Sequence, residues 1–171
     1  MTNVNQQAVR TIPPEILAKA AKVGEASGLC EVRLVSQEVR LGPLEGITVS
    51  RIGHQCRVMR DAQNSKGVVE AAFAFELLKD KDTEPQTFIR AVFALGFNVN
   101  ELDSFSDDEI QAFGEVTGSV ISYPFFRELL YSTLSRMGLP PIVLPSFRIA
   151  ADKADASSAT VRDPIASQQP S

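Results

Sequence analysis

The strongest constraint on the fold comes from a long helix in the second half of the chain. Its stretch, residues 106–147, opens with SDDEIQAF, in which Ser106 is followed three residues later by Glu109. This spacing predicts a capping box, and the acids between them favour the positive end of the helix dipole. Pro124 is expected to kink or restart the helix because it cannot donate to the preceding turn. Gly138 is expected to end it.

This helix is apolar over more of its circumference than contact with one sheet requires. One stripe at helical spacing consists of Tyr123, Phe126, Leu130, Leu134 and Met137. A second stripe, made by Ile121, Phe125 and Leu129, widens the apolar arc to about 220°, roughly twice what one sheet needs. We therefore expect one face to pack on the chain's own sheet and the other on a second subunit. Gly114 and Gly118 are predicted to join Ile121 and Leu129 in that interface, since small residues allow a close approach.

Four strands are predicted before this helix. The ranges 29–41, 47–60, 68–78 and 87–99 are rich in β-branched or aromatic residues and separated by turn signals. The last two alternate strictly, and the charged segment 79–85 reads as a hairpin connection. A short helix is predicted after Pro13 and Pro14. The expected class is α+β, a four-stranded antiparallel sheet packed on a long C-terminal helix with a short N-terminal helix.

The chain divides into three predicted regions. Residues 1–28 form an N-terminal arm and the short helix, and residues 29–149 form the main domain. Residues 150–171 are rich in Ala, Ser and Asp, so we expect a disordered tail. With 171 residues, the chain is long enough for one core without disulfides.

Composition excludes several classes of protein. A net charge of −4 and a pI near 5.1 argue against a nucleic-acid binder, which carries a basic stripe. Two cysteines provide no disulfide framework, so a reducing cytoplasm is the expected compartment. No run approaches the ~18 apolar residues of a membrane span, so direct membrane insertion is not expected.

Catalytic and metal-ligating patterns are sparse. His54 and Cys56 share one side of a predicted strand, but two ligands do not make a zinc site, and a structural pair is favoured. Cys30 is expected to be a small buried hydrophobe. Capping accounts for the acids at 107–109. The sequence contains no phosphate loop or dinucleotide fingerprint, so no cofactor and no metal are expected.

The end of the long helix resembles a known family. The residues that carry the resemblance are Tyr123, Pro124, Phe125, Phe126, Arg127, Glu128, Ser135, Arg136 and the run from Leu139 to Pro145, LPPIVLP. This pattern is similar to the signature region of the SecB family of protein-export chaperones. The predicted order of four strands followed by a long helix also matches that family's layout. The segments CEVRLV and DEIQAFGEVTG are most similar to SecB-like chaperones associated with toxin–antitoxin systems.

The resemblance implies a cytoplasmic, ATP-independent holdase that binds unfolded or precursor polypeptides and assembles as a homotetramer, a dimer of dimers. No catalytic residue is implied. Client-binding side chains are expected among Tyr123, Phe125, Phe126, Leu139, Ile142, Val143, Leu144 and Phe147. The partners implied are the unfolded chains, other copies of the protein, and either the motor SecA or an antitoxin.

The sequence departs from the family where SecA docks. Glu38 matches one docking acid, and Ile89 or Phe88 matches an apolar neighbour, but the next acidic position is Gly42. The family's acid in the fourth strand falls on Arg90 or Ala91. Lost acids weaken pairing with a basic motor, which favours a specialised role such as the dedicated chaperone of one antitoxin.

Two other classes of function stay open at this point. A hotdog-type thioesterase would use Glu115 or Glu128 to activate water, although no His or Asn is expected beside them. A plain assembly subunit would use the same apolar helix without binding clients.

Overall fold

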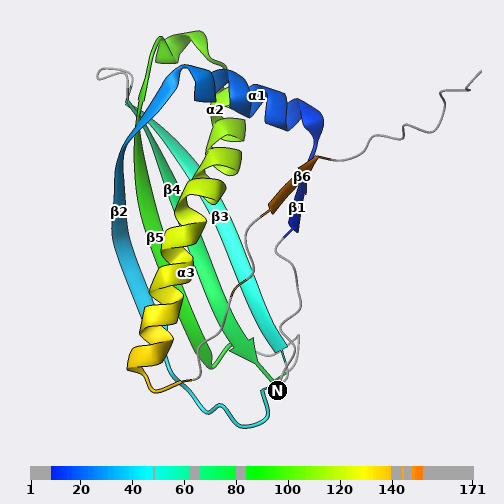
Figure 1. Cartoon of the computed structure of the whole chain (residues 1–171), viewed down its shortest axis with the longest axis vertical. Coiled ribbons are helices and arrows are strands. Elements are labelled where there is room, and N and C mark those ends of the chain that lie inside the picture. Colours follow the sequence, from blue (N-terminus) through cyan, green and yellow to red (C-terminus); the bar gives the residue numbers. More distant parts are fainter. Residues whose placement is uncertain are drawn as a thin grey trace, which may run out of the picture.

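The protein, seen in a computed structural model, consists of one twisted sheet with a long helix lying along one face (Figure 1). The structure describes residues 9–47, 49–61, 66–79, 84–139, 144 and 148–151. The α+β class predicted from the sequence is confirmed. Among the described residues, no helix is long and apolar enough to cross a membrane.

Four antiparallel strands form the sheet, in the order β2-β5-β4-β3. They span Ser27–Arg40 (β2), Val49–Asp61 (β3), Lys66–Leu78 (β4) and Thr87–Val99 (β5). All four predicted strands are confirmed, with small differences at the ends. The odd-numbered residues of β5 from 89 to 99 are all buried under the helix, as their alternation predicts. Strands β2 and β3 are the two edges of the sheet.

The helix layer begins at the predicted capping box. Ser106 Oγ accepts from the Glu109 amide at 3.3 Å, and the Ser106 amide donates to Glu109 Oε2 at 2.9 Å. Helix α2 (Asp107–Phe113) continues through one π-helical turn (Gly114–Gly118) into α3 (Ser119–Arg136). The predicted core stripe is confirmed, because Tyr123, Phe126, Leu130 and Leu134 are all buried.

Pro124 does not end the helix, so the predicted restart there is wrong. Helix α3 runs through Pro124, and the irregular turn lies upstream at residues 114–118. Two serine hydroxyls supply extra bonds in this region: Ser119 donates to the Glu115 carbonyl and Ser122 to the Gly118 carbonyl. Such back-bonding to the preceding turn is a common accompaniment of bent or irregular helices.

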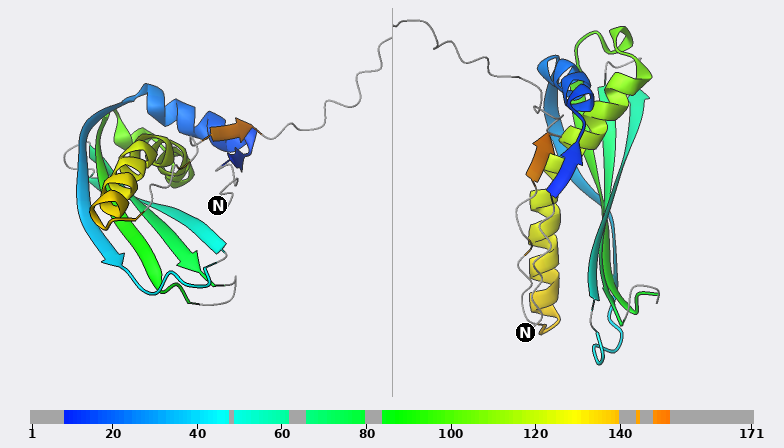
Figure 2. Two further views of the ribbon diagram at one scale, coloured as in Figure 1. Left: turned by 60° about the horizontal axis from the view of Figure 1, so that its bottom comes forward. Right: turned by 90° about the vertical axis from the view of Figure 1, so that its right-hand side faces the viewer.

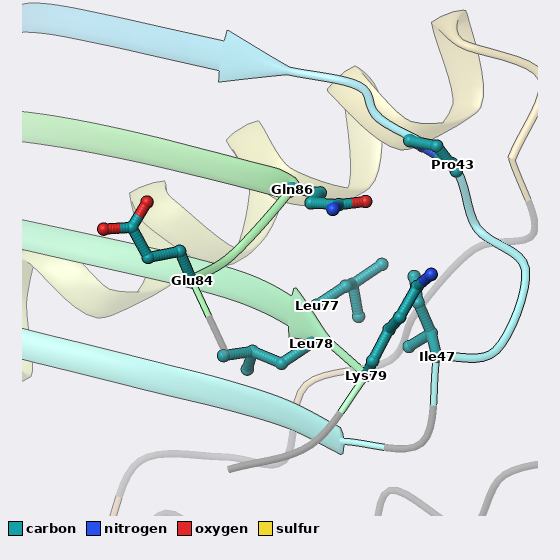
Figure 3. Close-up of a pocket in the computed structure, with 7 residues that line it drawn as sticks. All are labelled: Pro43, Ile47, Leu77, Leu78, Lys79, Glu84 and Gln86. Carbon is teal, nitrogen blue, oxygen red and sulfur yellow. The ribbon is translucent and has the colours of Figure 1, made fainter. Parts of the chain in front are cut away.

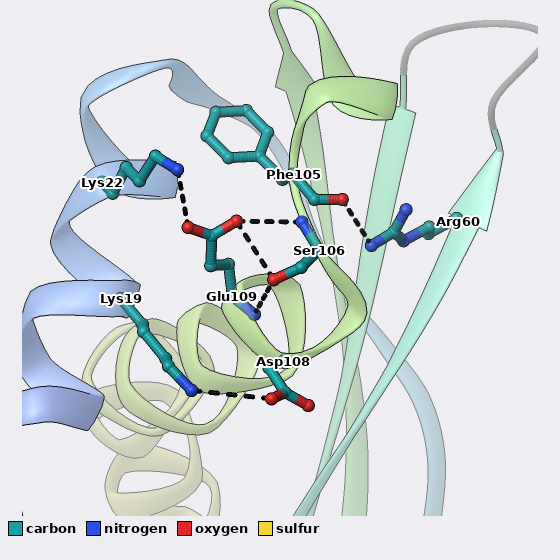
Figure 4. Close-up of polar contacts among 7 residues, drawn as sticks. All are labelled: Lys19, Lys22, Arg60, Phe105, Ser106, Asp108 and Glu109. Carbon is teal, nitrogen blue, oxygen red and sulfur yellow. Dashed lines mark hydrogen bonds and ion pairs between the residues drawn. The ribbon is translucent and has the colours of Figure 1, made fainter.

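The short helix α1 (Pro14–Glu25) crosses the end of the long helix and is held there by ion pairs (Figure 4). Lys22 Nζ lies 2.6 Å from Glu109 Oε1, and Lys19 Nζ lies 3.6 Å from Asp108 Oδ2. Arg60, from strand β3, donates to the Phe105 carbonyl at 3.1 Å. Arg60 also lies 2.9 Å from Asp107 Oδ1, so the capping acids connect α1 and β3 to α2.

The two ends of the described chain form a small second sheet that the sequence does not predict. Strand β1 (Val9–Ile12) pairs in parallel with β6 (Arg148–Ala151), beside the helix layer and apart from the main sheet (Figure 2). The predicted start of the tail at residue 150 falls inside β6. The remainder of the predicted tail lies outside the described residues.

Candidate functional site

The edge strand β2 exposes an unusual amount of apolar surface. Leu29, Leu34, Val35 and Val39 are 40% to 50% exposed, and β2 has two register irregularities against β5. Its outer edge has no strand beside it within the described residues. An exposed apolar edge strand is a template for pairing with another chain. This edge is therefore a strong candidate for a binding surface.

The helix face next to β2 continues this apolar surface. Phe125 is 45% exposed, and its ring lies 6.4 Å from that of Phe93. Gln37 of β2 donates to Thr133 of α3 at 3.2 Å, which fixes the edge strand beside the helix. Further round the helix, Val120 and Tyr131 are also exposed. The wide apolar arc thus has one face buried on the sheet and apolar side chains exposed beyond it.

The glycine pair lies at a different contact from the one predicted. A methyl group on Gly114 would lie 2.1 Å from Val58 Cγ2, and one on Gly118 would lie 2.6 Å from Val69 Cγ1. Both glycines face the chain's own sheet, so the predicted subunit contact at Gly114 and Gly118 is wrong. Their small size serves the approach of the helix to β3 and β4. Ile121 and Leu129 are half-buried and pack partly against the core.

Most of the predicted client-binding residues that the structure describes are buried in the single chain. Tyr123 and Phe126 lie in the core, and burial raises the pKa of the Tyr123 hydroxyl. Leu144 is fully buried, and Leu139 packs partly against the same core. Phe125 alone among these described side chains is largely exposed. Ile142, Val143 and Phe147 lie outside the described residues.

The outer face of the sheet carries a chain of charges across all four strands. Arg51 of β3 lies 2.5 Å from Glu76 of β4, and Glu76 in turn lies 3.3 Å from Arg90 of β5. Arg90 then reaches Glu38 of β2 at 3.8 Å and covers the ring of Phe88 at 4.2 Å. Each acid on this path faces an arginine, so the negative charge is locally neutralised.

In the fourth strand, Arg90 and Ala91 were the two possible matches to the family's acid, and they lie on opposite faces of the sheet. Arg90 lies on the outer face beside Glu38, and Phe88 is buried there at 4% exposed beneath Arg90 and Arg40, whereas Ala91 faces the helix. Ile89 is 2% exposed and packs in the core, so its predicted place in a motor contact on the outer face is wrong. Of the two positions aligned with the family's acid, Arg90 is the one on the outer face.

The single histidine belongs to a hydrogen-bonded cluster between β3 and α3. His54 Nε2 lies 2.8 Å from Ser119 Oγ and 3.2 Å from Cys56 Sγ. The Ser119 hydroxyl also donates to the Glu115 carbonyl and lies 3.9 Å from Cys56 Sγ. The arrangement is that of the structural pair favoured from the sequence. Among the described residues, no group of three or more His, Cys, Asp or Glu could hold a metal ion.

The remaining polar candidates are placed as follows. Cys30 is exposed on β2, so its predicted burial is wrong. Glu115 accepts from Gln111 Nε2 at 3.2 Å, and Glu128 is exposed on α3. A depression at the end of the sheet is lined by Pro43, Ile47, Leu77, Leu78, Lys79, Glu84 and Gln86 (Figure 3).

The strand order and the long helix along one face define a SecB-like fold. The chain is similar to the SecB-like chaperone Rv1957 of Mycobacterium tuberculosis, solved in complex with a ChAD peptide from the antitoxin HigA1 (Rv1956). The TM-score is 0.65 at 20% identity, and the match covers 76% of this chain and 94% of the other.

A second solved structure is less similar. It is a protein of unknown function from Streptococcus agalactiae, with a TM-score of 0.39 at 14% identity, covering 69% of this chain and 95% of the other. No protein-family model and no curated protein matches the sequence.

Proposed function

We propose that this protein is an ATP-independent holdase that binds unfolded polypeptides in the cytoplasm. The observation that carries the proposal is the SecB-like fold, shared over nearly all of a chaperone solved with a bound peptide. The exposed apolar surface of α3 at Phe125, beside β2, supports it, because such a surface accepts extended chains with little demand on sequence. Holding the unfolded state then withdraws it from aggregation by mass action.

Self-association is the second part of the proposal. Two copies would pair through the open edges of their β2 strands, extending the sheet and covering Val35 and Val39. The exposed face of α3, with Val120 and Tyr131, would then join two such dimers into the tetramer.

A dedicated antitoxin chaperone is the second candidate function, and a specific feature favours it over delivery to SecA. Arg90 stands on the outer face where the export family has an acid, and it neutralises Glu38 and Glu76. A basic docking element of a motor would meet little free negative charge there. The antitoxin peptide bound to the Mycobacterium tuberculosis chaperone is consistent with this role.

Light scattering at micromolar concentration tests the assembly. We expect the mass of a tetramer for the wild type and a smaller species for Val35→Lys, because a charge on an edge strand opposes pairing. Arg33→Lys on the same strand is the matched control and should keep the wild-type mass. A monomeric wild type would overturn the assembly.

Binding of a permanently unfolded protein, reduced and alkylated α-lactalbumin, tests the holdase activity. We expect Phe125→Ser to weaken binding by about 10-fold, from the loss of one buried aromatic contact. Glu128→Gln, on the same helix, should bind like the wild type. If a toxin–antitoxin pair is encoded beside the gene, its antitoxin is added to the assay to separate the two roles. Binding of that antitoxin alone, with no affinity for unfolded α-lactalbumin, supports the dedicated role and overturns the general one.

A further inference from the structure

The outer face of the four-stranded sheet is uncovered in the single chain. Helices α1 and α3 and the β1–β6 pair lie on the opposite side, and no described helix or strand lies against this face (Figure 2). Its strands are 13 or 14 residues long, so the face measures at most about 800 Å². A standard interface takes about 800 Å² from each partner. The proposed tetramer uses the β2 edge and α3, so it leaves this face free for a further contact.

The register of the strands arranges the outer face in rows that carry charge at the two ends. The first row consists of Arg51, Glu76, Phe88 and Arg40, and the last row consists of Asp61, Lys66, Asn98 and Gly28. On β3 and on β4, the first and last rows therefore carry opposite charges. Between these rows lie several small residues, namely Gly53, Ala72, Ala74, Ala94 and Gly96.

A second copy placed face to face with the first can meet these charges with their complements. When it is turned over about a two-fold axis that crosses the strands, each strand faces the same strand of the second copy, running in the reverse direction. Arg51 then lies opposite Asp61 of the second copy, and Glu76 lies opposite its Lys66. The two-fold symmetry repeats each of these contacts, so opposite charges meet at both ends of the face.

The sizes of the facing side chains also match. Under the same axis, three of the larger residues lie opposite small ones: Met59 opposite Gly53, Arg90 opposite Gly96, and Val68 opposite Ala74. Large residues that face small ones allow two sheets to interdigitate. A twisted sheet keeps the hand of its twist when it is turned over, so the two twisted faces also fit each other.

Charge disfavours the other simple arrangement. A two-fold axis along the strands would bring arginines together, Arg51 opposite Arg40 and Arg57 opposite Arg33. The crossing axis has one like-charge contact on β2, between Glu38 and Glu31. Each of these two acids already lies 3.8 Å from an arginine of its own chain, which neutralises it locally.

We infer that the outer face of the sheet is a contact between two copies of this chain, related by a two-fold axis that crosses the strands. The contact goes beyond the proposed tetramer, because it joins one such assembly to the next. Its ion pairs lie at the ends of exposed strands, so the contact is weakened by salt and forms at high protein concentration.

Sedimentation at low and high salt measures this contact in a Val35→Lys parent, in which pairing through β2 is opposed. We expect Arg51→Glu and Asp61→Arg each to weaken the low-salt association of this parent by about 10-fold or more, since each facing pair on β3 then consists of like charges. An equimolar mixture of the two variants should regain the affinity of the parent to within about 3-fold, because each altered residue then faces its complement.

The mixture separates this contact from effects inside one chain. Positions 51 and 61 are about 33 Å apart along β3, so recovery on mixing arises only between chains. Arg136→Glu, at the end of α3, changes the net charge by the same amount as Arg51→Glu and is the matched control, expected to associate like the parent. A mixture that associates no more tightly than either variant alone would overturn the inference, as would a parent whose mass is the same at low and high salt.

Crosslinking gives a second test that leaves the charges unchanged. In chains carrying Cys30→Ser and Cys56→Ala, Ala74→Cys and Val68→Cys are prepared as two separate proteins. A short bismaleimide should link the two proteins when they are mixed. Either protein alone should stay unlinked, because its two copies of the cysteine lie about 20 Å apart along the strands. A mixture without the link would also overturn the inference, and binding of unfolded α-lactalbumin by these same proteins tests the holdase proposal separately.

Discussion

Replacing Gly114 by alanine tests whether the close contact of the helix with its own sheet sets the stability of the fold. The new methyl group would lie 2.1 Å from Val58 Cγ2. Carbon atoms in contact are normally about 3.5–4.0 Å apart, so the helix or Val58 must move. Val58 is β-branched and has few alternative rotamers in the strand, which limits its freedom to give way.

Two effects oppose each other in this variant. Overpacking costs about 1–3 kcal/mol, whereas alanine in place of a helical glycine returns up to about 1 kcal/mol. We expect the free energy of unfolding to fall by about 1–2 kcal/mol. For a chain of this size, that corresponds to a Tm lower by about 2–8 °C.

Urea and thermal unfolding at one fixed protein concentration measure this change, because assembly makes stability concentration-dependent. The double variant Gly114→Ala with Val58→Ala is the control, since removing the Val58 methyls should abolish the cost of the added one. Gly28→Ala is a second control, at a glycine with nothing within 4 Å of the new methyl. A Gly114→Ala protein as stable as the wild type, or one destabilised equally in the Val58→Ala background, would refute the packing argument.

Two further changes probe the polar contacts and the backbone. Hydrogen bonds from the Lys22 side chain and, second, from the Ser106 backbone amide lower the pKa of Glu109 from 4.5 to about 2. The ionised Glu109 therefore contributes its full stability above pH 4.5, and this contribution is lost as the pH falls towards 2. Glu109→Gln should therefore unfold at lower urea than the wild type at pH 7 and converge with it near pH 2; a constant difference across that range would contradict this. Glu101 has a φ of 52°, so Glu101→Gly should raise the free energy of unfolding by about 1 kcal/mol, whereas Glu101→Val should lower it. A more stable valine variant in thermal unfolding would contradict the backbone explanation.

The sequence predicts those parts of the fold whose residues act locally. The capping box at Ser106 and the alternation in β4 and β5 are visible in short windows, and the structure confirms them. The buried stripe on α3 is likewise a matter of helical spacing. In contrast, β1 and β6 are separated by almost the whole length of the chain. Each strand has only four residues, which is too short for an alternating pattern that would predict the pairing.

The errors at the candidate site share one physical cause. Two faces of a helix can both look apolar, and the sequence does not say which neighbour covers each. Gly114 and Gly118 were equally suited to another subunit and to the chain's own sheet, and Val58 and Val69 occupy the space beside them.

The position of β2 has a consequence for synthesis of the protein. Its only neighbour within the described sheet, β5, is made after β3 and β4, and the helix that covers the sheet is made later still. During translation β2 therefore stays unpaired, with its apolar side chains exposed, while most of the domain emerges from the ribosome. A protein proposed to bind unfolded chains thus exposes an unpaired apolar strand during its own synthesis.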